Sequence, residues 1–121
     1  MPDRSTVEAF AALVEAGDFV GAIERYYAPE ASMQENNEAP RVGRDVLVAH
    51  EKQVLKAYPT VTARRLSPVQ INGDEVAIRW RFEMTSATGA TRVLEEIAWQ
   101  RWQSDRIVAE QFFYDPRQMA R

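Results

Sequence analysis

Cysteine is absent from the 121 residues, and histidine occurs only once, as His50. Without cysteine the chain can form no disulfide, no thiolate metal site and no cysteine nucleophile. A single histidine also falls short of the ligand sets that usually bind zinc. We therefore expect a protein that uses neither a metal nor another cofactor.

Long apolar runs and basic clusters are missing as well. No segment approaches the roughly 18 consecutive apolar residues of a membrane helix, and the first residues lack the pattern of a signal peptide. The net charge is −3, and the arginines are scattered apart from the pair Arg64-Arg65. Because nucleic-acid binding needs a clustered basic surface, we expect no nucleic-acid partner. The missing membrane helix and signal pattern lead us to expect no membrane partner and a cytoplasmic location.

The residues that are present predict one globular domain, residues 1–121, with helices in its first half. The 45% apolar and 27% charged fractions are ordinary for a globular domain of this length. Apolar side chains at helical spacing predict helices at residues 5–17, 19–27 and 45–58. Ser5 and Glu8 have the spacing of a capping box for the first helix. Asp18 is placed to cap the second.

The second half alternates with period two, which predicts strands. A short strand follows Pro29, and longer ones are predicted at residues 60–71, 75–84, 92–102 and 107–114. Asn72-Gly73-Asp74 is a hairpin signal. Three helices followed by an antiparallel meander, with one early strand, make an α+β plan. A curved sheet of this kind wraps the helices and leaves a cavity between the layers.

Short marks at the element boundaries cover nearly the whole chain. They are Glu15-Ala16-Gly17-Asp18, Tyr27-Ala28-Pro29-Glu30-Ala31, Val42-Gly43-Arg44, Asn72-Gly73-Asp74, Arg106-Ile107 and Phe113-Tyr114-Asp115-Pro116. Together they resemble the nuclear transport factor 2-like superfamily and, within it, the SnoaL-like small proteins. The resemblance implies a cone-shaped, curved antiparallel β-sheet wrapped around three N-terminal helices. It says little about activity, because the fold hosts isomerases, cyclases, dehydratases, hydrolases and non-catalytic binding domains.

Glu35 is the first candidate for a functional residue. The early strand carries apolar Ala31 and Met33 on one phase, and Glu35 continues that phase. A carboxyl group on a buried phase is costly unless it is hydrogen-bonded or functional. The alternative is a carboxylate tied to a nearby arginine, Arg41 or Arg44. Asn37 could orient a ligand, or it could be a turn residue.

Within the superfamily, the resemblance to ketosteroid isomerases can be followed residue by residue. The run 31–35 resembles the run that ends near their general base, which places Glu35 at the base position. Their oxyanion tyrosine corresponds to Phe10, which has no donor, and their oxyanion carboxylic acid falls near Ala98. Without those donors steroid-type isomerisation lacks its largest electrostatic contribution. We therefore expect an activity other than that of a ketosteroid isomerase.

Glu110 is the second carboxyl candidate, as a partner of Glu35 in acid/base chemistry; the alternative is that it pairs with an arginine. His50, the only side chain with an ordinary pKa near neutrality, lies at the edge of a helical apolar stripe and is either structural or part of the site. By the resemblance, further polar and aromatic side chains line the cavity, although each could be plain core. They are Tyr26, Trp80, Gln100, Trp102, Phe112 and Tyr114.

The opposite phases of the strands predict a second surface. Ile97 and Trp99 lie among charged side chains there, which is unusual for the surface of a monomer. A homodimer interface explains this pattern. The face comprises Arg79, Arg81, Ile97, Trp99 and Arg101.

Two hypotheses for the function follow. In the first, the aromatic-lined cavity binds a small apolar or polycyclic molecule and performs cofactor-free isomerisation, cyclisation or dehydration. Glu35 is then the base, assisted by Glu110 or Tyr114. In the second, the protein is a non-catalytic ligand-binding or dimerisation module with structurally neutralised carboxyl groups. A protein-interaction role is a third possibility, supported by the fold alone.

Overall fold

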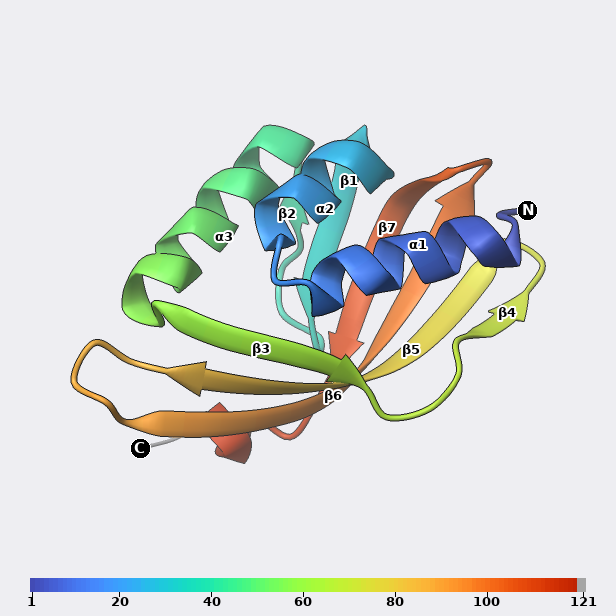
Figure 1. Cartoon of the computed structure of the whole chain (residues 1–121). Helices are drawn as coiled ribbons and strands as arrows, with labels where there is room; N and C mark the ends of the chain where they lie inside the picture. Colours follow the sequence, from blue (N-terminus) through green and yellow to red (C-terminus); the bar gives the residue numbers. More distant parts are fainter. Residues whose placement is uncertain (120–121) are drawn as a thin grey trace.

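The computed structural model describes residues 1–119 and shows three helices gathered on one side of a strongly curved sheet (Figure 1). The elements are α1 (Arg4–Glu15), α2 (Phe19–Tyr26), β1 (Tyr27–Glu35), β2 (Arg41–Val42), α3 (Arg44–Ala57), β3 (Thr60–Arg65), β4 (Gln70–Asn72), β5 (Glu75–Thr85), β6 (Thr91–Gln103), β7 (Arg106–Phe113) and the 3-10 turn η1 (Pro116–Met119). The predicted α+β class is confirmed.

One sheet holds all the strands in the order β2-β1-β7-β6-β5-β3, with β4 paired to β5. Its pairs are antiparallel, as predicted, except that β1 runs parallel to β7. The sheet is therefore mixed. Only strands joined by a hairpin are forced to be antiparallel, and most of the chain separates β1 from β7. The predicted strand at residues 60–71 divides into β3 and β4, with residues 66–69 between them.

The helix ends agree only in part with the sequence prediction. α1 begins at Arg4 with Asp3 at its N-cap, so the capping box predicted at Ser5 is wrong. Asp18 does cap α2: its Oδ1 accepts a hydrogen bond from the backbone N–H of Gly21 at 2.9 Å. α2 then ends at Tyr26, well before Pro29, and Tyr27 is already part of β1.

The core lies between α1, α2 and the concave face of the sheet. The apolar stripe of α1 is buried, with Phe10 edge-on to the ring of Trp102 at 6.0 Å. The alternation of β5 places Ile78 and Trp80 inside, as predicted, with exposed fractions of 0% and 2%. None of the helices within residues 1–119 has the length and apolar character that crossing a membrane requires.

Candidate functional site

A cavity of about 360 Å³ lies between the helices and the concave face of the sheet. Its wall is mostly apolar and aromatic, with Phe10, Phe19, Tyr58, Trp80, Phe82 and Phe112 among the lining residues. Into this wall the chain inserts polar and titratable side chains from five elements: Tyr27, Glu35, Arg41, His50, Glu51, Glu96, Glu110 and, after β7, Tyr114. An apolar cavity with a few polar groups is the usual form of a small-molecule site.

Glu110 of β7 is held at both oxygens by the protein. Its Oε1 accepts a hydrogen bond from the Tyr27 hydroxyl, and its Oε2 accepts one from Gln100 Nε2 at 2.6 Å. The indole N–H of Trp102 donates to Gln100 Oε1 at 2.9 Å. Because an indole nitrogen only donates, it fixes the orientation of the Gln100 amide and therefore makes Gln100 Nε2 the donor to Glu110. Burial raises the pKa of Glu110 to about 7, despite these hydrogen bonds.

Glu96 of β6 carries a carboxyl group whose hydrogen bonding is incomplete. Its Oε2 is buried, and no hydrogen-bond partner for it is found within residues 1–119. Burial, together with the negative charges of Glu110, Glu35 and Glu51, raises the pKa of Glu96 to about 8. At neutral pH this side chain is therefore an acid that can donate a hydrogen bond into the cavity. A buried polar atom without a partner is expensive unless a ligand satisfies it.

Glu35, at the end of β1, is in the opposite electrostatic situation. Burial acts to raise its pKa, but hydrogen bonds from Arg41 at 2.9 Å and from the Tyr114 hydroxyl at 2.8 Å outweigh burial and lower it. The predicted alternative of an arginine partner is thus realised at Arg41. Glu35 nevertheless borders the cavity, where it is ionised at neutral pH.

The helix α3 contributes His50 and Glu51 to the same wall. Burial and the nearby charge of Arg41 lower the pKa of His50, so its imidazole is neutral at pH 7. Burial raises the pKa of Glu51. Within residues 1–119 no three His, Cys, Asp or Glu side chains are grouped so that they could hold a metal ion.

The structure brings six of the predicted site residues together at the cavity: Glu35, His50, Trp80, Glu110, Phe112 and Tyr114. Four others lie elsewhere. Tyr26 packs edge-on against Phe10 because α2 ends one residue early and gives the cavity position to Tyr27. Asn37 is exposed in the turn after β1. Gln100 and Trp102 are buried behind the wall: Gln100 bonds to Glu110, and Trp102 bonds to Gln100 and packs against Phe10.

Sequence reasoning missed Glu96, Glu51 and Arg41 as cavity residues. For Glu96 a signal was present. It shares the inward phase of β6 with Ala98, Gln100 and Trp102, so the alternation alone places a carboxyl group on the concave face. Phe10 has no donor, as expected, and Glu96, two residues before Ala98, lines the cavity with a raised pKa.

Fold and cavity together define a small-molecule-binding domain of the nuclear transport factor 2-like class. The family model of the SnoaL-like domain matches residues 7–110, which is most of the chain. The protein therefore belongs to the SnoaL-like domain family, as the resemblance predicted. No curated protein matches the sequence.

Solved structures agree with this assignment. A protein of Mesorhizobium loti, described as a candidate SnoaL-like polyketide cyclase, is 25% identical with a TM-score of 0.76, covering 91% of this chain and 97% of its own. TerC, co-crystallised with polyporic acid, is 14% identical (TM-score 0.79; 95% and 92% covered). A protein of Catenulispora acidiphila with a ketosteroid isomerase-like fold, in complex with trimethylamine, is 17% identical (TM-score 0.76; 91% and 85% covered). At these identities the last two show the fold alone.

Proposed function

We propose that this domain binds a small, mostly apolar carbonyl compound in the cavity and acts on it by cofactor-free proton transfer, of the isomerase, cyclase or dehydratase type. One observation carries the proposal: Glu35 and Glu96 share a cavity, and their pKa values are shifted in opposite directions. Two carboxyl groups of opposite protonation state are what acid/base catalysis at neutral pH needs. The candidate cyclase of Mesorhizobium loti supports the same class of chemistry.

The roles follow from the protonation states. Glu35 is ionised and accepts a proton from the carbon next to the carbonyl group. Glu96 is protonated and donates to the carbonyl oxygen. When Glu35 returns a proton to the same carbon and Glu96 takes back its own, the hydrogen on that carbon can exchange with solvent. When the proton is delivered to a different carbon, the reaction is an isomerisation. Glu110 is not the acid of first choice, because both its oxygens are already bonded by Tyr27 and Gln100.

The proposal can be tested with an aromatic ketone, 2-acetylnaphthalene, as the probe. In D₂O its methyl protons should exchange with solvent in the presence of the protein, measured by proton NMR. Glu35→Gln should still bind the ketone but lose about 10²–10⁴-fold in exchange rate, the usual contribution of a general base. Glu95→Gln, on the outer phase of β6, is the matched control and should leave the rate unchanged. No exchange above the rate in buffer, or equal exchange in Glu35→Gln, would refute the catalytic part.

The proposed binding of the ketone can be tested separately, through the pH dependence of its affinity. A ketone takes a hydrogen bond from protonated Glu96, so its affinity should fall as the pH rises through about 8, the pKa of that group. In Glu96→Gln the side chain stays a donor and cannot ionise, so the affinity should become independent of pH in this range. Tryptophan fluorescence can follow the titration because Trp80 lines the cavity. A wild-type affinity that is flat from pH 7 to 9 would contradict the role of Glu96.

A second candidate is that the cavity hosts an organic cation. Four carboxyl groups beside aromatic rings favour it. The matched amine, 1-(2-naphthyl)ethylamine, distinguishes the two. A cation binds the ionised carboxyl groups, so its affinity should rise with pH over the range in which that of the ketone falls. If the ketone binds more tightly at pH 7 and its affinity falls with pH, the ligand is a carbonyl compound. If the amine binds more tightly at pH 7 and its affinity rises with pH, the ligand is an organic cation.

A further inference from the structure

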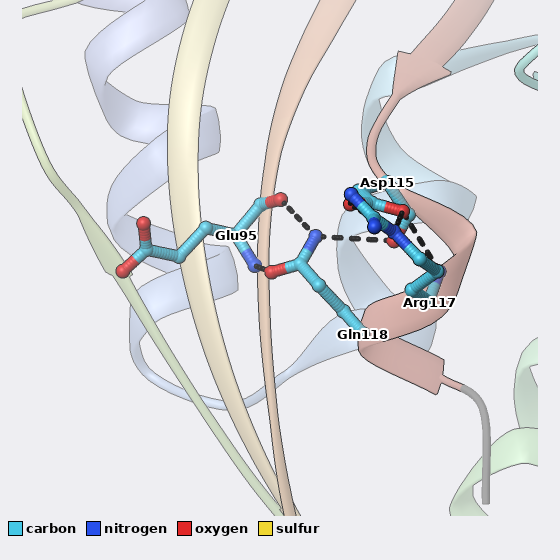
Figure 2. Close-up of polar contacts among 4 residues, drawn as sticks. All are labelled: Glu95, Asp115, Arg117 and Gln118. Atoms are coloured by element: carbon cyan, nitrogen blue, oxygen red, sulfur yellow. Dashed lines mark hydrogen bonds and ion pairs between the residues drawn. The ribbon is translucent and has the colours of Figure 1, made fainter.

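The end of β7 leaves part of β6 to be covered by another segment. β7 pairs with β6 from Ile97 to Gln103, whereas β6 itself extends back to Thr91. At Glu95 the side chain of Gln118, from η1, takes the place of a strand. Its Oε1 accepts from the Glu95 backbone N–H at 2.9 Å, and its Nε2 donates to the Glu95 backbone oxygen at 2.9 Å (Figure 2). A carboxamide carries the same donor and acceptor as a peptide group, which allows this pairing.

Within residues 1–119, the other polar contacts of the turn are made with its own neighbours in the chain. Arg117 forms an ion pair with Asp115 at 2.7 Å, and the backbone N–H of Gln118 donates to the Asp115 oxygen at 3.0 Å (Figure 2). Both contacts stay inside the segment after β7. The two bonds of Gln118 to Glu95 attach this turn to the sheet.

Each of the two bonded residues, Glu95 and Gln118, is followed in the chain by a residue that lines the cavity. Glu96, which follows Glu95, and Met119, which follows Gln118, both line the cavity. Alternation along β6 sends the Glu95 side chain outward, toward Arg81, and the Glu96 side chain inward. Gln118, bonded to the Glu95 backbone, is thus directly followed by a residue that lines the same cavity as Glu96.

We propose that Gln118 is a positioning residue of the site: by binding both backbone groups of Glu95 it holds Met119 in the cavity wall and keeps water from the Glu96 carboxyl group. The inference deepens the proposed function, since Glu96 is the proposed acid. It makes the C-terminal turn part of the site rather than a surface feature.

The environment of Glu96 sets the expected effect. Acidic groups face it from β7 (Glu110), β1 (Glu35) and α3 (Glu51), and all three raise its pKa in addition to burial. Arg41 on the same wall carries the opposite charge, and the imidazole of His50 beside it is neutral at pH 7. Release of the turn changes none of these side chains but admits water, which favours the ionised form. The pKa of Glu96 should therefore fall from about 8 toward its ordinary value.

The experiment compares Gln118→Ala with Arg117→Ala, a matched change one residue away that removes an exposed ion pair and keeps the two bonds to Glu95. Carbon-13 NMR of the glutamate carboxyl groups, with Glu96 assigned by its loss in Glu96→Gln, follows the titration without any ligand. We expect the Glu96 midpoint to fall by about one pH unit or more in Gln118→Ala, a tenfold or larger change in the protonation equilibrium. It should stay unchanged in Arg117→Ala.

A second variant covers the case in which Gln118→Ala destabilises the fold. Met119→Ala keeps the bonds to Glu95 and removes only the covering side chain, so it should lower the Glu96 midpoint in the same direction. An unchanged midpoint in both variants would overturn the inference. Because the titration needs no substrate, it is independent of ketone exchange: failure of the exchange assay alone would refute the proposed catalysis and leave the positioning role intact.

Discussion

The two faces of β6 carry the same kinds of residue with opposite physical properties. Glu96 and Trp102 face inward. Their counterparts Glu95 and Trp99, one and three residues earlier, face outward. Trp102 is 1% exposed and Trp99 is 45% exposed. The Glu95 carboxylate pairs with Arg81 at 2.7 Å on the surface, whereas Glu96 has a buried oxygen without a partner within residues 1–119 and a pKa of about 8. Position in the pleat, not residue type, decides which side chains belong to the site.

The largest difference is expected between the two tryptophans. Trp102→Ala removes a fully buried indole and leaves Gln100 Oε1 without its donor, so the free energy of unfolding should fall by about 3–5 kcal/mol. Trp99→Ala should change it by no more than about 0.5 kcal/mol, because this side chain is half in solvent. Urea denaturation at low protein concentration measures both. Equal losses would show that the outer face is as tightly packed as the core.

A smaller difference separates two replacements of Glu110. Glu110→Ala strips Gln100 Nε2 and the Tyr27 hydroxyl of their acceptor in the core, which should cost about 2 kcal/mol or more. Glu110→Gln keeps an acceptor for Gln100 and offers a donor to Tyr27, so it imitates the protonated acid and should cost far less at pH 6.

The same pair reports the pH dependence. The folded chain holds the Glu110 proton more tightly than the unfolded chain, so wild-type stability should fall as the pH rises from near 4.5 to about 7. Glu110→Gln should remove its share of this slope, as measured by urea denaturation across that range. An unaltered slope would place the responsible proton elsewhere, with Glu96 as the next group to examine.

Much of the fold was predictable because it depends on local patterns. The alternation of β5 and the cap at Asp18 were both read correctly from adjacent residues. The parallel pairing of β1 with β7 was not, since it joins segments that no hairpin connects. The capping box at Ser5 failed because the N-cap of the helix is Asp3, two residues earlier.

The site was predictable in its location and less so in its chemistry. The position of Glu35 at the end of an inward phase was enough to place it at the cavity. Its ion pair with Arg41 was recognised only as an alternative, because the register of a two-residue strand, β2, decides it. Glu96 was overlooked although its phase was known; its raised pKa depends on carboxyl groups from three other elements, which only the folded chain brings together.

The outer face, finally, predicts an assembly whose loss should leave the fold intact. Ile97, Trp99 and Phe113 are 42%, 45% and 44% exposed, and Ile97 pairs directly with Phe113 across β6 and β7. Charges of both signs surround this apolar strip: Arg79 and Arg101, and Glu83 and Glu95. A second copy related by a two-fold axis can cover the apolar side chains and pair with these charges. We propose a homodimer through this face.

Trp99→Glu should then convert a dimer to a monomer in sedimentation experiments while the ketone exchange rate stays the same, because Trp99 lies on the far side of the sheet from the cavity. A wild-type protein that sediments as a monomer at high concentration would refute the dimer, and loss of exchange in the monomeric variant would show that the two faces are coupled through β6.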